Sequence, residues 1–234
     1  MLCPKARKVK ACLTLPAGVV YCDTEKSKRG GTQMHLFYSA VMAGVMTGLG
    51  GAAFLGAEHR EVGALLFSVG MFAALALGLP LYIGRCAGAI CHRPRQLRML
   101  PGLLLGNLLG AVLCGLVYGR AMTSAAPALQ AARLEQPFFS TLVRGTFCGM
   151  MIYAGSRSWK ALACGKPAGP LLAVTAFIVA GFENSVADAF YFGAAFSQTG
   201  VFDPGVLPFM LAAVLGNTLG PVLLCLAIPS GETS

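Results

Sequence analysis

The sequence predicts an all-α integral membrane protein with six spans, built as two inverted three-helix repeats whose second and fifth helices are broken. Composition is the first observation behind this prediction. Of the 234 residues, 56% are hydrophobic and only 12% are charged, whereas soluble domains carry roughly 25% charged residues. The second observation is a series of apolar windows of about 20 residues, the length that crosses a bilayer. The third is an internal repeat, because two short motifs recur in the two halves of the chain.

Short charged segments separate the apolar windows, such as EHRE at 58–61 and HRPRQLR at 92–98. We therefore expect a basic N-terminal tail (1–33), a transmembrane domain (34–228) and a short C-terminal tail (229–234). The predicted spans are 34–56, 62–91, 100–119, 138–155, 168–192 and 205–228.

The distribution of Lys and Arg predicts the orientation of these spans. Seven basic residues lie in the first 33 positions, and three more lie in each of the segments 92–99 and 156–167. The other basic residues fall in the opposite connections (Arg60, Arg120 and Arg133) or at membrane depth (Arg85 and Arg144). Because connections rich in Lys and Arg stay on the cytoplasmic side, we expect both termini in the cytoplasm and the chain in the plasma (cytoplasmic or inner) membrane.

The repeat relates residues that are far apart in the chain. LGNLLGAVL at 105–113 matches LGNTLGPVL at 215–223 in seven of nine positions, and GLPLYIG at 78–84 corresponds to GFENSVA at 181–187. Each half then has three crossings, and an odd number makes the two halves run in opposite directions across the membrane. The two repeats cover 34–119 and 138–228.

Each repeat is expected to have a glycine-initiated interruption in its second helix, near 79–84 and near 181–185. Non-helical backbone is tolerated at membrane depth only where protein buries it or where it lines a cavity, and the free N–H groups at a half-helix start favour an anion. The alternative is two continuous helices that are merely kinked at packed glycines. The candidate loop residues are Pro80, Leu81, Tyr82 and Ile83, and the candidate pore-centre residues are Glu183, Asn184, Ser185 and Asp188.

Polar side chains at membrane depth need internal partners. We expect Glu183 to cap the second half-helix or to accept hydrogen bonds from the facing loop near 80–84, and we favour this structural role over a direct role in transport. Asn107 and Asn217, from the repeated GN motif, are expected to bond across the breaks rather than to contact a substrate.

The motifs do not indicate enzymatic or metal chemistry. The sequence has no phosphate-binding Gly-rich loop, Ser/His/Asp set, HExxH or CxxC, and its three histidines, His35, His59 and His92, lie at span ends. Cysteine in an apolar run acts as a small hydrophobe, as we expect for Cys86, Cys114, Cys148 and Cys225. We therefore expect no catalytic residues, no metal, no cofactor and no nucleic-acid partner.

These motifs resemble those of the formate–nitrite transporter family. The fifth-helix signature of that family is close to GFEHS-x-AN, and this chain has GFENSVAD at 181–188. The Gly-rich first span (GVMTGLGG, 44–51) and both GN-x-x-G helices also fit, and the likeness covers roughly 34–228. The resemblance implies an aquaporin-like fold and a homopentamer in the lipid membrane with one pore per protomer. It also implies passage of small monovalent anions, formate-like by default, with nitrite or hydrosulfide as alternatives.

The resemblance also implies particular pore residues. An entrance cation, a lysine in the family, corresponds to Arg133, while the central histidine is Asn184 here and the usual asparagine four residues later is Asp188. The implied constriction side chains are Phe67, Met71, Leu81, Tyr82 and Phe177. An amide has no proton to exchange, so two other functions stay open: a channel for neutral small solutes or weak acids, and a relative that no longer transports.

Overall fold

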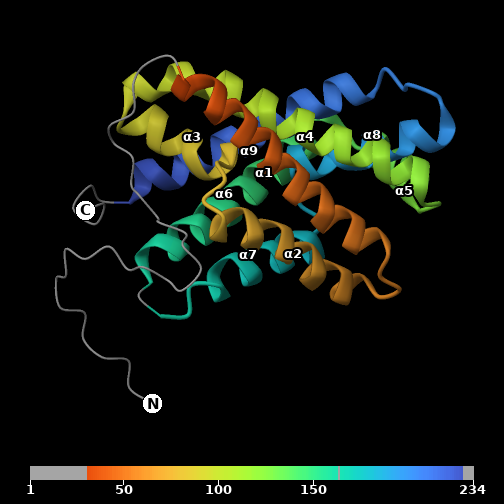
Figure 1. Cartoon of the computed structure of the whole chain (residues 1–234), viewed down its shortest axis with the longest axis horizontal. Helices are drawn as coiled ribbons and strands as arrows, with labels where there is room; N and C mark the ends of the chain where they lie inside the picture. Colours follow the sequence, from red (N-terminus) through yellow and green to blue (C-terminus); the bar gives the residue numbers. More distant parts are fainter. Residues whose placement is uncertain (1–30, 163, 229–234) are drawn as a thin grey trace.

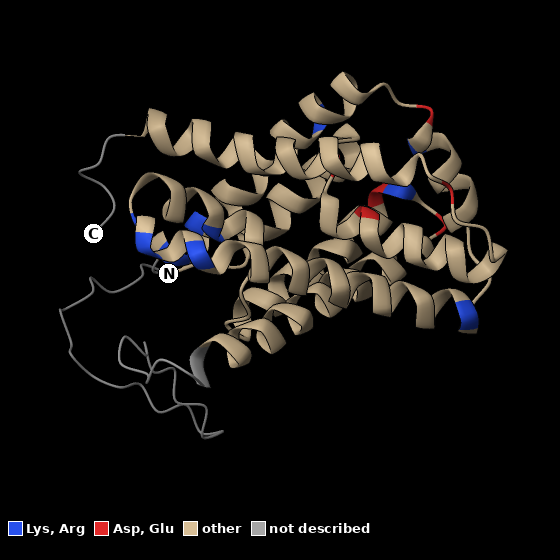
Figure 2. Cartoon of the chain, turned by 90° about the horizontal axis from the view of Figure 1, so that it is seen from above, with Lys and Arg blue, Asp and Glu red and all other residues tan. Residues whose placement is uncertain are grey.

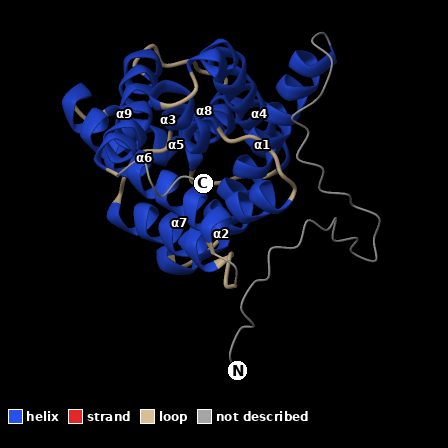
Figure 3. Cartoon of the chain, turned by 90° about the vertical axis from the view of Figure 1, so that its left-hand side faces the viewer, coloured by secondary structure: helices blue, strands red, loops and turns tan. Residues whose placement is uncertain are grey.

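The computed structural model describes residues 31–162 and 164–228, so nearly all of the two predicted tails lies outside the described residues. Every regular element in this part of the chain is a helix, and short loops join the helices (Figure 3). In order, the elements are α1 (Gly31–Leu55), α2 (Arg60–Ala76), α3 (Tyr82–Cys91), the 3₁₀ helix η1 (Pro94–Met99), α4 (Leu100–Ala121), α5 (Ala126–Leu134), α6 (Phe138–Ala161), α7 (Ala168–Ala180), α8 (Ser185–Thr199) and α9 (Val206–Ala227).

The helices agree closely with the predicted spans and form one bundle (Figure 1). Helices α1, α4 and α9 are each long and apolar enough to cross a bilayer, and α7 with α8 forms a bent pair whose axes differ by 60°. The predicted span 62–91 is divided between α2 and α3, and 168–192 between α7 and α8. The alternative of continuous, merely kinked helices is therefore wrong at both positions.

Helix α5 was not predicted. It occupies the connection between the two repeats, where the sequence analysis expected no element. Its start at Ala126 is followed by Pro127 in the first turn, a position that proline favours because the missing N–H would have no partner there. The Ala-rich sequence APALQAARL also favours a helix, so the signal was present but weaker than the long apolar windows on either side.

The two breaks have the same backbone conformation. Helix α2 is followed by Gly78 (φ 69°) and α7 by Gly181 (φ 73°), a left-handed conformation that glycine adopts without the steric cost of a Cβ atom. In both breaks the N–H after the glycine bonds a carbonyl five residues earlier, at 2.8 Å from Leu79 and at 2.9 Å from Phe182. This hydrogen bond is the Schellman C-cap, so both helices stop by the same device.

Asn107 joins the first break to its own repeat. Its side-chain oxygen accepts the Tyr82 N–H at 2.8 Å, and its amide nitrogen donates to the carbonyls of Ala40 (2.8 Å) and Pro80 (3.1 Å). Because this amide satisfies the first free N–H of α3, the helix begins directly after Leu81. Tyr82 and Ile83, predicted as loop residues, therefore form the first turn of α3.

Asn217 makes the corresponding bonds in the second repeat. Its side-chain oxygen accepts the Ser185 N–H at 2.8 Å, and its amide nitrogen donates to the carbonyls of Gly145 and Glu183, both at 2.8 Å. Helices α1 to α4 therefore correspond to α6 to α9 in position and in their internal hydrogen bonds, with α5 inserted between the two sets.

The two repeats run in opposite directions. Helices α2 and α7 occupy equivalent places and pack against each other, yet Arg60 at the start of α2 donates to the carbonyl of Ile178 near the end of α7, at 3.0 Å. The two helices are thus antiparallel. Each half-helix packs against a long helix of the other repeat: α3 packs on α9, and α8 packs on α4.

Glycines allow the helices of each repeat to approach closely. A Cβ atom on Gly110 of α4 would overlap the carbonyl oxygen of Val41 in α1, and one on Gly220 of α9 would overlap that of Thr146 in α6. Close backbone contact through small residues is the usual packing mode of membrane helices. This contact places Asn107 and Asn217 within reach of the breaks.

Charged residues occupy the two ends of the bundle unequally. Figure 2 shows a group of Lys and Arg at the end where α9 finishes, whereas Asp and Glu lie in the other half of the molecule, where further basic residues are scattered. That the end rich in Lys and Arg faces the cytoplasm stays a prediction.

Candidate functional site

A narrow cavity lies where the two breaks meet. It is lined by residues from α1, α2, α4, α6, α7, the two breaks and both half-helices: Thr47, Phe67, Met71, Leu81, Tyr82, Ile83, Asn107, Ile152, Val174, Phe177, Asn184 and Val186. The centre of a water-sized sphere can occupy only about 20 Å³ of it, which is room for about one water molecule. None of the residues that line it is charged.

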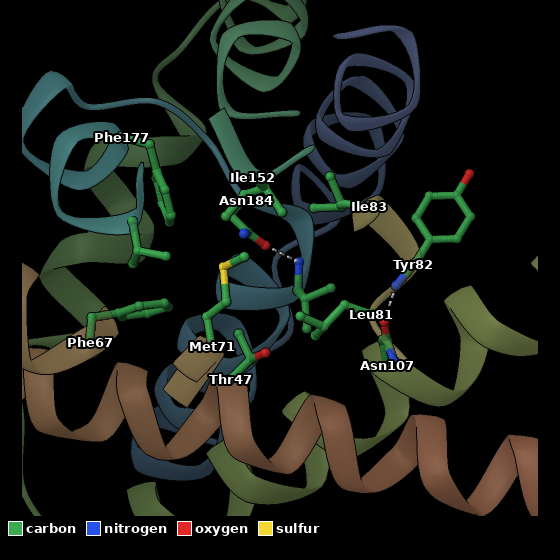
Figure 4. A pocket seen from close by; sticks show the side chains of 12 residues that line it. Thr47, Phe67, Met71, Leu81, Tyr82, Ile83, Asn107, Ile152, Phe177 and Asn184 are labelled. Carbon is green, nitrogen blue, oxygen red and sulfur yellow. Dashed lines mark hydrogen bonds between the residues drawn. The ribbon is translucent and has the colours of Figure 1, made fainter. Parts of the chain in front are cut away.

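All five residues implied as constrictions lie on this cavity. Figure 4 shows Phe67, Met71 and Phe177 gathered on one side and Leu81 on the other. The rings of Phe67 and Phe177 meet edge to face with centroids 6.2 Å apart. Apolar side chains at this spacing leave too little room for a hydrated anion, so the path is closed here.

Tyr82 contributes its backbone rather than its ring. Figure 4 shows the ring directed away from the cavity, and its hydroxyl lies 2.8 Å from the Thr218 hydroxyl of α9. Thr47, Ile152 and Val174 line the cavity and were not predicted. Thr47 belongs to the Gly-rich stretch of the first span, GVMTGLGG at 44–51. It is the one polar side chain of that stretch, and this was the available signal.

Asn184 is the polar side chain that reaches the cavity from the second break (Figure 4). It is the N-cap of α8, and its side-chain oxygen accepts the N–H groups of Val186 (3.0 Å) and Ala187 (3.3 Å). An N-cap asparagine satisfies N–H groups that would otherwise lack a partner. Its oxygen is thus engaged by the helix, and its NH₂ group is left as the donor available to the cavity.

Glu183 is buried beside the cavity but not in contact with the facing loop. Its carboxylate accepts from Arg133 Nε at 3.0 Å and from Gln136 Nε2 at 2.8 Å, so the expected side-chain contact with the loop near 80–84 is replaced by contacts with the segment around α5. The Glu183 backbone carbonyl accepts from Asn217 at 2.8 Å, and this bond joins the second break to its own repeat.

Arg133 lies between two acids. Its Nε is 3.0 Å from an oxygen of Glu183 and also 3.0 Å from Oδ1 of Asp188. The guanidinium stacks 4.9 Å above the centroid of the Tyr191 ring, and only 16% of the side chain is exposed. The entrance cation implied by the resemblance is therefore held in an ion-pair cluster, which we call the outer acid cluster: Arg133, Gln136, Glu183 and Asp188.

Asp188 lies one helical turn beyond Asn184 on α8, and its side chain is fully buried. Ser185 is also fully buried, with a hydroxyl that has no hydrogen-bond partner among the described residues, and it does not line the cavity. The candidate pore-centre set thus divides in two, with Asn184 at the cavity and the two acids in the outer acid cluster.

Cys148 was interpreted as a small hydrophobe; it lies in the hydrophobic core, and polar groups are also near it. It is fully buried on α6, next to the Asn184 side chain and within electrostatic range of Glu183 and Asp188. Nothing in the apolar run of α6 signals this, since the neighbours come from α8 and the second break.

Two exposed arginines bond to the end of α7. Arg60 donates to the Ile178 carbonyl at 3.0 Å, and Arg144 donates to the Gly181 carbonyl at 3.1 Å. Cations are favourable at a helix C-terminus because its free carbonyls carry partial negative charge. The membrane-depth position of Arg144 is explained by this contact.

Within residues 31–162 and 164–228, no three His, Cys, Asp or Glu side chains are grouped so that they could hold a metal ion. The site is instead a closed apolar passage between two helix breaks, with a buried acidic cluster beside it. Such an arrangement defines a membrane channel or transporter.

Comparison with known proteins gives the family. The model of the formate/nitrite transporter family matches residues 19–230, and the chain belongs to this family. Its members are channels and transporters, so the chain is a membrane transport protein and not an enzyme. No curated protein sequence matches the chain significantly.

Solved structures confirm the fold. One, described as an "FNT family ion channel", superposes with a TM-score of 0.75 at 21% identity, covering 85% of this chain and 92% of the other. Another, a "Pentameric formate channel with formate bound", superposes with a TM-score of 0.68 at 17% identity, covering 84% of this chain and 96% of the other. The prediction of an all-helical channel fold is thus confirmed.

Proposed function

We propose that this chain passes small monovalent anions across the plasma membrane, with formate-like carboxylates as the default substrate. The observation that carries the proposal is the cavity between the two breaks, closed by Phe67, Met71 and Phe177 and reached by the donor group of Asn184. Nitrite and hydrosulfide have the same charge and similar size, so they remain within the proposal.

The electrostatics near the cavity support an anion. The half-helices α3 and α8 both begin at the breaks, and their N-termini carry positive partial charge. Two exposed arginines, Arg60 and Arg144, lie together at the end of α7, where they would raise the local concentration of anions before the constriction.

A second candidate is passage of the neutral weak acid. It is favoured by the cavity lining, which contains no charged residue, and by Asn184, which has no proton to exchange. A neutral acid crosses an apolar constriction at a lower desolvation cost than its anion.

We also propose a homopentamer with six spans per protomer and with both termini in the cytoplasm. The neighbour described as a pentameric channel supports the assembly, and the Lys and Arg at one end of the bundle support the orientation (Figure 2). Native mass spectrometry of the detergent-solubilised chain tests the assembly, and a monomer or dimer as the largest species would contradict it.

Flux into liposomes tests the substrate. The influx of labelled formate, nitrite, lactate and hydrosulfide is measured at a fixed total concentration of each compound. The pH is varied to change the fraction of each compound that is neutral. If the anion is the permeant species, formate flux follows anion concentration; if the weak acid is, flux follows the neutral fraction. If flux equals that of empty liposomes for every compound, the chain is instead a relative that no longer transports, the alternative that the sequence left open.

A further inference from the structure

The outer acid cluster has more negative than positive groups. Glu183 and Asp188 bring two carboxyl groups together, and Arg133 is the one guanidinium that contacts them among the described residues. The side chains of the two acids are 4% and 0% exposed. If both acids were ionised, the cluster would carry a net negative charge in a place with almost no access to water, which is costly.

The two carboxyl groups are not equally supplied with donors. Glu183 accepts from Arg133 Nε at Oε2 and from Gln136 Nε2 at Oε1, so each of its oxygens has a donor. Asp188 lies 3.0 Å from the same Nε, but neither of its oxygens receives a hydrogen bond from any described residue. A fully buried carboxylate without a donor is unfavourable, since ionised oxygens are acceptors only.

Oε2 of Glu183 and Oδ1 of Asp188 both lie 3.0 Å from the same nitrogen, Arg133 Nε, so the two carboxyl groups adjoin each other. A hydrogen bond between them requires that one of them carries a proton. We propose that Asp188 binds a proton and donates it in a hydrogen bond to Glu183, while Glu183 stays ionised and paired with Arg133. The cluster is then neutral, and the Asp188 carboxyl has a partner.

Within residues 31–162 and 164–228, the surroundings of Asp188 do not supply another counter-charge. The titratable groups in electrostatic range are Cys148 from α6 and Tyr191 from α8 itself, besides Arg133 and Glu183. Neither a thiol nor a phenol offers a positive charge. The carboxyl proton therefore lies on Asp188, one turn of α8 from Asn184, rather than on the residue at the pore centre.

Infrared spectroscopy of the full-length protein in detergent tests this without any measurement of transport. A protonated carboxyl group has a carbonyl stretch that a carboxylate lacks. The chain contains three aspartates, Asp23, Asp188 and Asp203, so labelling aspartate with ¹³C at the side-chain carboxyl marks few groups. Near neutral pH we expect such a band, shifted by the label.

Variants assign the band. Asp188→Asn should remove it, and Asp203→Asn, which changes an exposed carboxyl bonded to the Gly205 N–H, should leave it unchanged. A native spectrum without the band, or a band that the aspartate label does not shift, would overturn the proposal. The labelled native protein gives this answer even if Asp188→Asn does not fold, and the result stands whether or not the chain conducts formate.

Discussion

The two helix breaks share one backbone design but differ in chemistry. Both follow a left-handed glycine, both carry the same Schellman hydrogen bond, and both are closed by an asparagine that accepts one N–H and donates to two carbonyls. Between these fixed points the first break has Leu79, Pro80 and Leu81, and the second has Phe182, Glu183 and Asn184.

The difference shows where the repeat has been specialised. The glycines and the two amides are needed for any chain to stop and restart a helix at membrane depth, because every freed polar group needs a partner there. The side chains between them are under no such requirement. In the first break they are apolar and only Leu81 lines the cavity, and in the second they bring an amide to the cavity and a carboxylate to Arg133.

The largest expected effect comes from the amides that the breaks share. Asn107→Ala and Asn217→Ala each leave one N–H and two carbonyls without their partner, and a buried unsatisfied group costs about 1–3 kcal/mol. We expect both to lower thermal stability by a similar and large amount. Asn184→Ala is the internal control, because it removes only an N-cap worth about 1 kcal/mol.

Thermal unfolding followed by size-exclusion chromatography measures these three variants together. If only one of the variants Asn107→Ala and Asn217→Ala loses much thermal stability, the two breaks are not energetically equivalent, despite their matching hydrogen bonds.

The next largest effect on stability is expected to differ between the two breaks. Glu183→Ala removes the acceptor of Arg133 and Gln136 and leaves the guanidinium with Asp188 alone, so we expect a loss of about 1–3 kcal/mol together with lower flux. Pro80→Ala, at the equivalent place in the first break, removes no polar contact of a side chain and should cost less. Native stability with a selective loss of flux in Glu183→Ala would instead indicate that Glu183 acts directly in conduction.

A smaller and equal effect is expected at the two glycines. Gly78→Ala and Gly181→Ala force a Cβ atom into the left-handed region, which costs about 1–2 kcal/mol. Gly88→Ala on α3 is the control, because a Cβ there meets nothing within 4 Å and alanine favours a helix. Chemical or thermal unfolding compares the three variants, and a cost in the control as large as in the others would contradict this account.

The architecture could be predicted largely from sequence because it depends on local and periodic signals. Apolar windows located the spans, and the repeated GN motif with its equivalent glycines located both breaks. Helix α5 was missed because its nine residues lie between stronger apolar signals. The start of α3 at Tyr82 was misplaced because its capping group, Asn107, is 25 residues away in the chain.

The site was less predictable, because its contacts join distant segments. Residue types identified Glu183, Asn184 and Asp188 as unusual at membrane depth, but nothing local shows that Arg133 lies between the two acids or that Cys148 adjoins them. Family resemblance gave five candidate constriction residues, all of which line the cavity, whereas the direction of the Tyr82 ring follows from its contact with Thr218 on another helix.

The smallest expected structural effect comes from Asn184→His. This variant places a titratable imidazole at the cavity, and neither break has such a group in the native chain. Histidine titrates near pH 6.5 in the absence of perturbation, whereas an amide has no titration between pH 5 and 8. We therefore expect flux through the native chain, at fixed anion concentration, to vary little with pH apart from the changing fraction of neutral acid.

The variant should add a transition in that range, displaced by the surroundings of the cavity. Below it the imidazolium would attract and retain an anion, and above it the neutral ring would behave more like the native amide, so flux changes with pH in one step. Asn184→Gln is the matched control, since it keeps an amide and should add no transition. If the native chain already shows a steep transition, Asp188→Asn decides its origin: loss of the transition assigns it to the outer acid cluster, and its persistence would show that the centre of the pore is not inert.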